Sequence, residues 1–331
     1  TGILKMTKTI HYITRKRLPS YNSIEELFLA ISARVKDTYA TQWVALRYTG
    51  ASPIRILKNI WSVKADPANI YHITGDVHYM ALAYRKRAIL TVHDVDSAFT
   101  GSYIKRMYVR LFWFWLPALF VKKITVISEF TKQQLTAIIP SFAHKITVVY
   151  NPVNPKIQPH IKDFNVIPTI LLLGTKSNKN LEQSLHAIKD IPCKVVIVGE
   201  LNAPQTRLLA SLKISYTHKQ NIPFEAIVTC YKQADIVCFP SLYEGFGMPI
   251  IEAQATGRVV LSSNIGAMKE IAGTGAHLVD PYSVAAITEG VLKIMKDPAY
   301  RERLIANGFT NAAKYSLDNT VSSYLRLYNE F

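Results

Sequence analysis

The sequence is poor in cysteine, and this scarcity excludes several classes of protein. Its 331 residues include three cysteines, Cys193, Cys230 and Cys238, an odd number without a C-x-x-C spacing. A disulfide framework or a cysteine-ligated zinc site needs more cysteines at closer spacings. We therefore expect reduced thiols in a cytoplasmic protein.

Long apolar runs are also missing. The longest run, residues 111–121, has eleven residues and contains a proline, which is too short to span a bilayer. The first residues lack the apolar core of a secretory signal. No internal repeat or low-complexity segment is visible, and a hydrophobic content of 49% indicates well-packed cores. The length suffices for two domains of ordinary size.

Negative charge is scarce in the first half of the chain. Residues 1–150 hold 21 Lys and Arg against 8 Asp and Glu, a net charge of +13. Residues 151–331 hold 18 against 15, which supplies the remaining +3 of the net +16. A basic half joined to a nearly neutral half indicates two separate tasks. We expect the basic half to meet a membrane surface or a polyanion.

Short apolar strands alternate with helical patterns in two runs, separated by the proline-rich segment NPVNPKIQP at residues 151–159. Such alternation predicts parallel sheets with helices on both faces. We predict an α/β protein of two doubly wound, Rossmann-like domains that face each other across a cleft. The predicted parts are residues 1–150, a hinge at 151–167, a second domain at 168–315, and a C-terminal helix at 316–331 that packs back toward the first domain. The predicted strands are 9–13, 42–46, 69–73, 88–92, 123–127 and 145–150, then 169–173, 194–199, 214–216, 235–239, 258–261 and 277–279.

The segment EGFGMPIIE, residues 244–252, carries the most specific functional signal. It follows a short apolar strand, and Gly245 and Gly247 let the backbone turn tightly before the next helix. A helix that begins near Met248 directs unpaired N–H groups and its positive end into this loop, where a phosphate binds readily. Glu244 and Glu252 can then flank the two ends of a diphosphate, as in a nucleotide-sugar. The alternative is an ordinary helix start with a glutamate that suits the helix dipole.

Further segments of the second half resemble those of a known protein family. LLLGTKSNKNLEQSLHAI, KVVIVGE, YKQADIVCFPSLYEGFGMPIIEAQATG and IGAMKEIAG…LVDP are similar, in this order, to the retaining glycosyltransferases of family 4, which have the GT-B fold. ILTVHD, ITVISEFTK and ITVVYNPVN extend the resemblance more thinly into the first half. It implies transfer of a sugar from a nucleotide-sugar donor to an acceptor hydroxyl, with no metal or other cofactor and no nucleic acid partner.

The resemblance also implies roles for single residues. Glu244 would contact the donor sugar, and Glu252 would bond the ribose hydroxyls. Lys179 would neutralise the leaving diphosphate, and His93, in TVHD, would contact the donor sugar from the first domain. The other donor-binding residues that it implies are Gly174, Thr175, Lys176, Glu200, Gly245, Phe246, Gly247 and Met248.

One departure from the family concerns the donor side. The family often has an arginine directly after the glycine equivalent to Gly174, and this chain has Thr175 there. Lys176 could serve as the second cation, or it could be a solvated surface residue.

Two patterns in the first half allow different interpretations. The Gly-Gly turn common in the family is replaced by TRKRLPSYNSIEE, in which Arg15, Lys16 and Arg17 could meet an acceptor phosphate or form a solvated charge run. Asp94 and Asp96 have the spacing of the metal-binding Asp-x-Asp motif of the other glycosyltransferase fold. The two runs of strand and helix speak against that fold, so we expect no metal.

The segment YIKRMYVRLFWFWLPALFVKK, residues 103–123, combines cations with aromatic residues. Such a segment can lie in a membrane interface, or it can pack as a helix in the core of the first domain. We expect a protein peripheral to the cytoplasmic face of the inner membrane. Its acceptor would be lipid-linked or a saccharide, in the synthesis of a bacterial surface polysaccharide such as O-antigen, lipopolysaccharide or capsule, or of a glycolipid.

Two other functions stay open at this point. Nucleotide-sugar epimerases and hydrolases can share the GT-B shape, because a fold does not determine a reaction. A non-catalytic basic protein that binds membranes or nucleic acid would also account for the charge. Such a binding protein would not need Glu244, Glu252, Lys179 and His93 together.

Overall fold

The computed structural model describes residues 6–15, 23–48, 50 and 52–331, and the chain divides into two compact units. Unit 1 consists of Thr1–Pro152 together with Leu317–Phe331, and unit 2 of Val153–Ser316. The chain therefore passes from one unit to the other twice, after Pro152 and after Ser316. In the part of the chain that the structure describes, no helix has both the length and the apolar character needed to cross a membrane.

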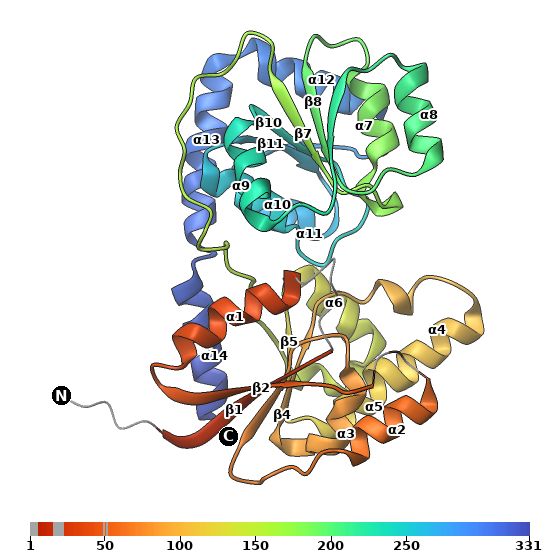
Figure 1. The fold of residues 1–331 in the computed structure, drawn as a ribbon, viewed down its shortest axis with the longest axis vertical. Helices are drawn as coiled ribbons and strands as arrows, with labels where there is room; N and C mark the ends of the chain where they lie inside the picture. The colour runs from red at the N-terminus through yellow and green to blue at the C-terminus, as the bar shows by residue number, and fades with distance from the viewer. Residues whose placement is uncertain (1–5, 16–22, 49, 51) are drawn as a thin grey trace, which may run out of the picture. The chain divides into compact units, whose positions relative to one another are not determined.

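Unit 1 is built on a six-stranded parallel sheet in the order β2–β1–β3–β4–β5–β6 (Figure 1). β3 and β4 are buried along their whole length, as expected for a parallel sheet covered on both faces. The strands are β1 (Met6–Thr14), β2 (Tyr39–Ala45), β3 (Ile70–Ile73), β4 (Ala88–Val92), β5 (Lys123–Val126) and β6 (Ile146–Val148).

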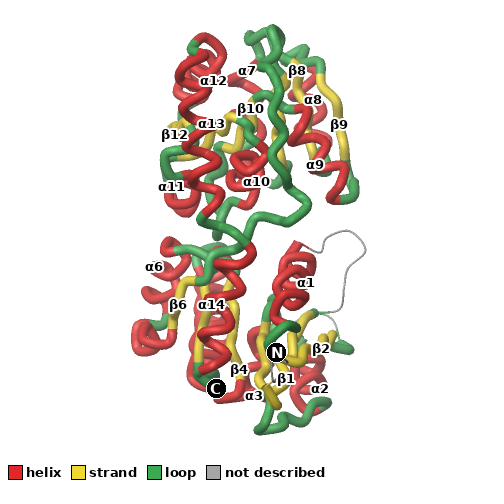
Figure 2. The backbone as a smooth tube through the Cα atoms, turned by 90° about the vertical axis from the view of Figure 1, so that its left-hand side faces the viewer, coloured by secondary structure: helices red, strands yellow, loops and turns green. Residues whose placement is uncertain are grey.

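The helices of unit 1 include an element from the far end of the chain, α14, which lies beside α1 (Figure 2). The α-helices are α1 (Ser23–Val35), α2 (Pro53–Trp61), α3 (Ala81–Tyr84), α4 (Tyr103–Val109), α5 (Leu116–Phe120), α6 (Glu129–Ile138) and α14 (Leu317–Asn329). The shorter helical turns are η1 (His78–Met80), η2 (Arg85–Arg87), η3 (Asp96–Ala98), the π-helix η4 (Arg110–Trp115) and η5 (Pro140–Lys145).

The sheet of unit 1 packs into two cores because alternate strand residues face opposite sides. On one face, Ile10 and Tyr12 of β1 pack with Phe28 of α1 and with Tyr324 and Tyr328 of α14. On the other face, residues such as Ile13, Leu90 and Val92 pack with η1, α3, α5 and α6. The core on the first face is therefore completed by the last helix of the chain.

Unit 2 is built on a second six-stranded parallel sheet, in the order β12–β11–β10–β7–β8–β9. This is the doubly wound order in which the chain starts at the centre, moves out to one edge, and returns to build the other half. The strand order changes direction between β7 and β10. The strands are β7 (Thr169–Leu173), β8 (Lys194–Val198), β9 (Tyr216–Lys219), β10 (Ile236–Phe239), β11 (Val259–Ser263) and β12 (His277–Val279).

Helices cover both faces of this sheet as well (Figure 1). One core is formed with α7, α12 and α13, and the other with α9, α10 and α11. The helices of unit 2 are η6 (Ser177–Lys179), α7 (Leu181–Ile188), α8 (Ala203–Ser211), α9 (Phe224–Gln233), α10 (Met248–Thr256), α11 (Gly266–Ala272), α12 (Val284–Lys296) and α13 (Pro298–Ala313).

The predicted fold class, two doubly wound parallel sheets, is confirmed. Each of the twelve predicted strands overlaps an observed strand, although the ninth overlaps β9 only at Tyr216. The described cysteines are free thiols, as expected, and Cys230 and Cys238 are buried. Residues 153–167, which the proline pattern placed in a hinge, fall within unit 2, where Lys162 bonds Asp235 and Ile157 joins a core.

Candidate functional site

Two loops of unit 2 meet at the carboxyl ends of β7 and β10, where the strand order changes direction. Leu242 N donates to Asn178 O at 2.8 Å, and Asn178 Nδ2 donates to Tyr243 O at 2.9 Å. The buried Asn180 Nδ2 donates to Pro240 O at 3.0 Å. In doubly wound sheets, ligands bind at this position. The two loops, residues 174–180 and 240–247, therefore form the candidate site.

Two of the charged residues predicted to act on the donor, Lys179 and Glu244, are brought together here. Lys179 Nζ lies 2.6 Å from Glu244 Oε1, with 21% and 15% of the two side chains exposed. Asn178 Nδ2 approaches the same carboxylate oxygen at 3.3 Å, and Lys179 Nζ lies 4.9 Å from the centre of the Phe239 ring. The ammonium group is thus held in place at the end of a side chain that stays partly exposed.

Gly174 acts through Lys179. Its φ of +88° is a conformation that residues with a side chain rarely adopt, and a Cβ built on it would lie 2.8 Å from Lys179 Cγ. The stem of Lys179 therefore lies directly against the glycine. A larger residue at position 174 would displace the ammonium group from Glu244.

The other predicted residues of this edge, Thr175, Lys176 and Glu200, differ in their surroundings. Thr175 is buried, and its Oγ1 donates to Glu200 O at 2.5 Å. Its own carbonyl accepts a hydrogen bond from Gln205 Nε2 at 2.7 Å. The Thr175 side chain thus supports the loop, whereas the side chains of Lys176 and Glu200 are exposed. Donor binding by these three residues stays a prediction.

The helix start that the sequence predicts is present at Met248. α10 begins there after Gly247, which has a φ of +106°, and no side chain caps its first turn. Phe246 is buried with its ring edge-on to Tyr315, so its side chain supports the loop from inside. An uncapped helix start of this kind suits an anion. Binding of a diphosphate by the backbone of residues 245–248 stays a prediction.

Glu252 lies in the second turn of α10 and is buried. Its Oε2 accepts a hydrogen bond from Tyr231 OH of α9 at 2.7 Å. Burial raises the pKa of Glu252 to about 7, although the hydrogen bond from Tyr231 lowers it in part. Near neutral pH this carboxyl is therefore poised between its two protonation states.

His93 belongs to unit 1 and follows β4. Its Nε2 lies 2.8 Å from Thr74 O, and its ring is edge-on to Phe28. Burial lowers the pKa of His93, which makes the neutral ring the stable form at pH 7. A carbonyl can only accept, so Nε2 carries the proton and Nδ1 is left as an acceptor. His93 is thus suited to accept a hydrogen bond from a hydroxyl group.

The remaining predictions for the first half concern Arg15, Lys16, Arg17 and the Asp94–Asp96 pattern. Arg15 Nε pairs with Glu25 Oε1 at 3.1 Å, while residues 16 and 17 lie outside the described residues. Asp94 Oδ1 accepts from the backbone N–H of Asp96 at 3.3 Å, as in a turn. In the ranges that the structure describes, no three His, Cys, Asp or Glu side chains are grouped so that they could hold a metal ion.

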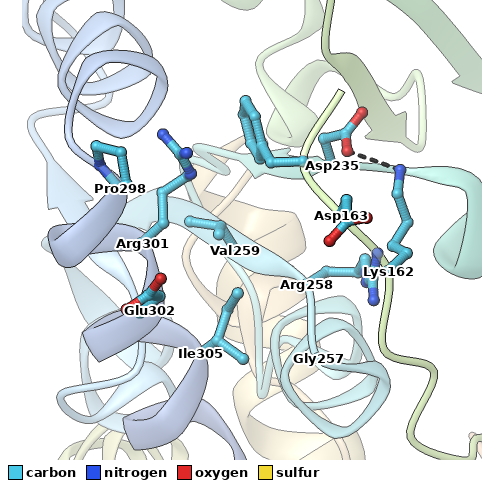
Figure 3. A pocket seen from close by; sticks show the side chains of 11 residues that line it. Lys162, Asp163, Asp235, Gly257, Arg258, Val259, Pro298, Arg301, Glu302 and Ile305 are labelled. Atoms are coloured by element: carbon cyan, nitrogen blue, oxygen red, sulfur yellow. Dashed lines mark hydrogen bonds and ion pairs between the residues drawn. The ribbon is translucent and has the colours of Figure 1, made fainter. Parts of the chain in front are cut away.

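A cavity of about 210 Å³ lies elsewhere in unit 2 (Figure 3). Asp235 and Arg258, two of its lining residues, directly precede β10 and β11, so the cavity is at the amino ends of these strands. Lys162, which also lines the cavity, pairs with Asp235 at 2.6 Å (Figure 3). The loops with Lys179 and Glu244 follow the carboxyl ends of the strands. The cavity is therefore separate from the candidate site.

Sequence reasoning missed three residues that organise the site: Asn178, Asn180 and Tyr231. All three lie in segments that carry the family resemblance, SNKN and YKQAD. Their partners are 21 to 101 residues away along the chain, so the contacts could not be read from local spacing. The available signal was that Asn178 and Asn180 flank Lys179, a residue already predicted to belong to the site.

Family models match the two parts of the chain separately. One described as "Glycosyltransferase Family 4" matches residues 27–157, and one described as "Glycosyl transferases group 1" matches residues 156–310. The O-antigen chain mannosyltransferase B of Escherichia coli is 25% identical over 82% of this chain and 77% of its own length. The MMP alpha-(1->4)-mannosyltransferase of Mycolicibacterium hassiacum is 30% identical over 46% of this chain and 40% of its own length.

Solved structures share the fold over nearly the whole chain. HepE of Anabaena, in complex with UDP and glucose, superposes with a TM-score of 0.80 at 13% identity and covers 98% of this chain and 100% of its own. WaaG, a glycosyltransferase involved in lipopolysaccharide biosynthesis, superposes with a TM-score of 0.72 at 11% identity over 97% and 99% of the two chains. The solved structures show that the chain has the GT-B fold, and the two adjoining family matches show that it belongs to the glycosyltransferases of group 1 and family 4.

Proposed function

We propose that this glycosyltransferase transfers a hexose, with mannose as the first candidate, from a nucleoside diphosphate donor to a hydroxyl group of a saccharide. The support for mannose is that relatives from Escherichia coli and Mycolicibacterium hassiacum are named mannosyltransferases. The support for a surface polysaccharide is that one of these relatives acts on the O-antigen chain and that WaaG belongs to lipopolysaccharide biosynthesis.

The observation that carries the proposal is the Lys179–Glu244 pair beside the uncapped start of α10. When a nucleoside diphosphate leaves, negative charge develops on its phosphate oxygens. A fixed ammonium group and helix amides stabilise such charge without having to reorganise. Lys179 would meet the diphosphate, and Glu244, held by Lys179 and Asn178, would contact the hydroxyls of the donor sugar.

We infer a retaining transfer without a covalent intermediate. The bond between the anomeric carbon and the phosphate oxygen breaks while a bond to the acceptor oxygen forms on the same face of the sugar. The acceptor proton passes to a phosphate oxygen of the leaving nucleoside diphosphate. Glu252 would accept hydrogen bonds from the ribose hydroxyls, and His93 Nδ1 would accept one from the donor sugar.

We also propose that the reaction needs no metal ion. The support is that Lys179 and the start of α10 already provide positive charge for the diphosphate. Transfer should therefore continue at an unchanged rate after exhaustive treatment with EDTA. A loss of activity that magnesium or manganese restores would contradict this part of the proposal.

The place of action that we propose is the cytoplasmic face of a bacterial inner membrane, with a lipid-linked or saccharide acceptor. The support is the net charge of +13 in residues 1–150 together with the polysaccharide roles in the names of the relatives. Transfer to a lipid-extract acceptor, followed with radiolabelled sugar, tests this placement.

Donor binding and turnover test the proposal most directly. Guanosine and uridine diphosphates and their mannose and glucose derivatives are screened for a rise in melting temperature, which selective binding must produce. The donor so identified is then used in a transfer assay, which also reveals hydrolysis or epimerisation. Lys179→Ala should lower kcat by about 10²–10³-fold because it removes a transition-state contact.

A matched lysine in the same unit provides the control. Lys189 lies just after α7, where its side chain is 46% exposed, and Lys189→Ala should leave kcat unchanged. Full turnover by Lys179→Ala would overturn the assigned role of the pair. Lys176→Ala in the same series tests whether that exposed lysine is a second cation of the site.

A further inference from the structure

Unit 1 exposes large apolar side chains on two helices, α2 and the continuous α4–η4 segment. On α2, Ile54 is 68% and Trp61 is 77% exposed, and on α4 Ile104 is 80% exposed. Scattered exposed apolar residues are normal, but many large ones gathered on two elements of one unit indicate an interaction surface. The exposed members are Ile54, Leu57 and Trp61 of α2 and Tyr103, Ile104, Met107, Tyr108, Leu111, Phe112 and Trp115 of α4–η4; we refer to them together as the docking surface.

The two helices belong to one surface because they share neighbours. Asn59 Nδ2 of α2 donates to Tyr79 OH of η1 at 2.9 Å, and the Tyr79 ring packs edge-on against Trp113 of η4. The inner residues of both helices, such as Ile56 and Val109, pack against the same core. Figure 1 shows α2 and α4 on the side of the sheet where α3 and α5 lie. The outward faces of both helices are therefore available to a single partner.

The charge on these segments has one sign. Residues 47–64 and 103–128 contain no aspartate or glutamate. Exposed cations stand between the apolar residues, among them Lys58 of α2, Lys105 of α4 and Arg110 of η4. Arg110 also lies 5.3 Å from the centre of the exposed Phe99 ring. A partner must therefore offer negative charge next to an apolar interior.

A bilayer of anionic lipid fits these requirements better than a protein or a polynucleotide. A second copy of this chain would bring the same cations against one another. A polynucleotide would satisfy the cations and stack on aromatic rings, but it offers nothing apolar to Ile54, Leu57, Ile104 and Met107. In a lipid interface, aliphatic and aromatic side chains enter the boundary of the acyl chains while Lys and Arg reach the head groups.

We propose that α2 and α4–η4 together form a two-helix surface that inserts into the interface of an anionic bilayer, with Trp61 of α2 as one of its anchors. This rests on the proposed function, since it supposes an acceptor at a membrane, and adds the surface and orientation by which unit 1 reaches it. A single helix can roll about its axis on a bilayer, whereas two helices define a plane. The pair therefore fixes the orientation in which unit 1 presents His93 and its neighbours.

Binding of the full-length protein to liposomes tests the proposal. Vesicles of phosphatidylcholine with phosphatidylglycerol are compared with vesicles of phosphatidylcholine alone, at low and at high salt. We expect binding to the anionic vesicles that weakens with salt. The double variant Ile54→Ser/Trp61→Ser and the double variant Ile104→Ser/Met107→Ser should each lower the affinity at least about tenfold, because each removes two exposed apolar anchors.

Tyr282→Ser is the matched control, since Tyr282 is a comparably exposed aromatic residue of unit 2, 66% exposed. All four proteins should melt at the same temperature and show the same thermal shift with the nucleoside diphosphate of the donor, because the substituted side chains are exposed. A change in nucleotide binding would count against the proposed donor site, whereas a change in liposome binding alone concerns the docking surface.

Three outcomes would overturn the proposal. If the α2 variant binds like the wild type while the α4 variant loses binding, α2 is not part of the surface. Equal binding to both vesicle types would remove the role of the cations. A wild-type dimer in analytical ultracentrifugation that both variants abolish would identify a second copy as the occupant.

Discussion

At the scale of single residues, Glu252 has properties that oppose each other. Its carboxylate form is the one that would accept hydrogen bonds from ribose hydroxyls in the proposed function, yet burial raises its pKa to about 7 and favours the protonated form. Tyr231 partly offsets this through its hydrogen bond at 2.7 Å. The tyrosine therefore acts as a positioning residue that also keeps more of the carboxyl ionised near neutral pH.

Substituting Tyr231 should shift the pH dependence of donor binding. In the wild type, affinity for the nucleoside diphosphate should fall as the pH drops below about 7, where Glu252 takes up a proton. Tyr231→Phe removes a hydrogen bond that lowers the pKa, so the midpoint should move to higher pH. Calorimetric titration over a pH series measures it. Tyr300→Phe, which removes a hydroxyl bonded to His277, is the control and should leave the midpoint in place; a shift to lower pH in Tyr231→Phe would contradict the assignment.

The raised pKa of Glu252 also affects the free energy of unfolding. Because the folded pKa lies above the ordinary value of 4.5, the contribution of Glu252 to stability is complete below about pH 4.5 and is lost as the pH rises through about 7. The loss is on the order of 3 kcal/mol at most. Glu252→Gln should therefore gain stability relative to the wild type as the pH rises across this window, as measured by chemical denaturation. A buried carboxyl group that lowers the stability of the fold near neutral pH is expected where the group serves function.

Gly174 gives a second prediction at this scale. In Gly174→Ala, the new Cβ would meet the side chain of Lys179, and alanine would be strained at a φ of +88°. Lys179 should move away from Glu244, and kcat for transfer to a soluble saccharide should fall by at least about tenfold. Gly101→Ala is matched for strain, with a φ of +94°, and its Cβ meets only the flexible side chain of Lys105. Equal losses in both variants would show that strain alone is responsible.

At the scale of elements, the buried carboxylate of Asp235 accepts several of the hydrogen bonds that hold the segment 153–167 on unit 2. Asp235 accepts from Lys162 Nζ at 2.6 Å, from Asn165 Nδ2 at 2.8 Å and from Thr169 N at 2.7 Å. Burial raises its pKa, but these hydrogen bonds outweigh burial and bring the pKa below the ordinary 3.8. One side chain thus joins the segment to the starts of β7 and β10.

Asp235→Ala should destabilise unit 2 by about 3 kcal/mol, because it leaves a shielded lysine and backbone donors without their acceptor. The stability that Asp235 contributes should be present above about pH 3.8 and be lost as the pH falls through its lowered pKa. Urea titration at several pH values measures both effects. Lys156→Ala breaks an exposed pair with Glu225 and should change little. If both variants behave alike, Asp235 is not the anchor of this segment.

At the scale of the whole molecule, unit 1 depends on the last helix of the chain. Val321, Tyr324, Leu327 and Tyr328 of α14 complete a core of unit 1, and Tyr328 OH lies 2.7 Å from the buried His72 Nδ1. Unit 1 is therefore assembled from two segments separated by the whole of unit 2. Its folding requires that the chain passes through unit 2 and returns.

A chain that ends at Ser316 should keep unit 2 and lose unit 1. Removal of α14 exposes an aromatic core, which costs several kcal/mol for each large side chain. Scanning calorimetry should show one transition fewer than in the full chain, while nucleotide binding by unit 2 persists. Arg34→Ala, which breaks only the exposed pair with Asp318, is the control and should keep both transitions. A truncated chain that retains both transitions would show that α14 is dispensable.

Much of this fold could be predicted from local patterns. Buried parallel strands read as short apolar runs, and all twelve were found because hydrophobic periodicity needs only neighbouring residues. The helix start at Met248 followed from the glycines before it and from Pro249 in its first turn. Local structure, which depends on residues close together in the sequence, can therefore be predicted from the sequence.

The contacts that make the candidate site required the tertiary structure. Lys179 and Glu244 are 65 residues apart, and their separation of 2.6 Å arises because β7 and β10 are neighbours in the sheet. The hydrogen bond from Tyr231 to Glu252 also arises from the packing of separate elements, and so does the packing of α2 and α4–η4 against one core. The sequence by itself determined which elements form and which residues stand at their ends. Only the packing of the sheets decided which of these side chains meet, because sheet order and helix packing depend on burial summed over the whole unit.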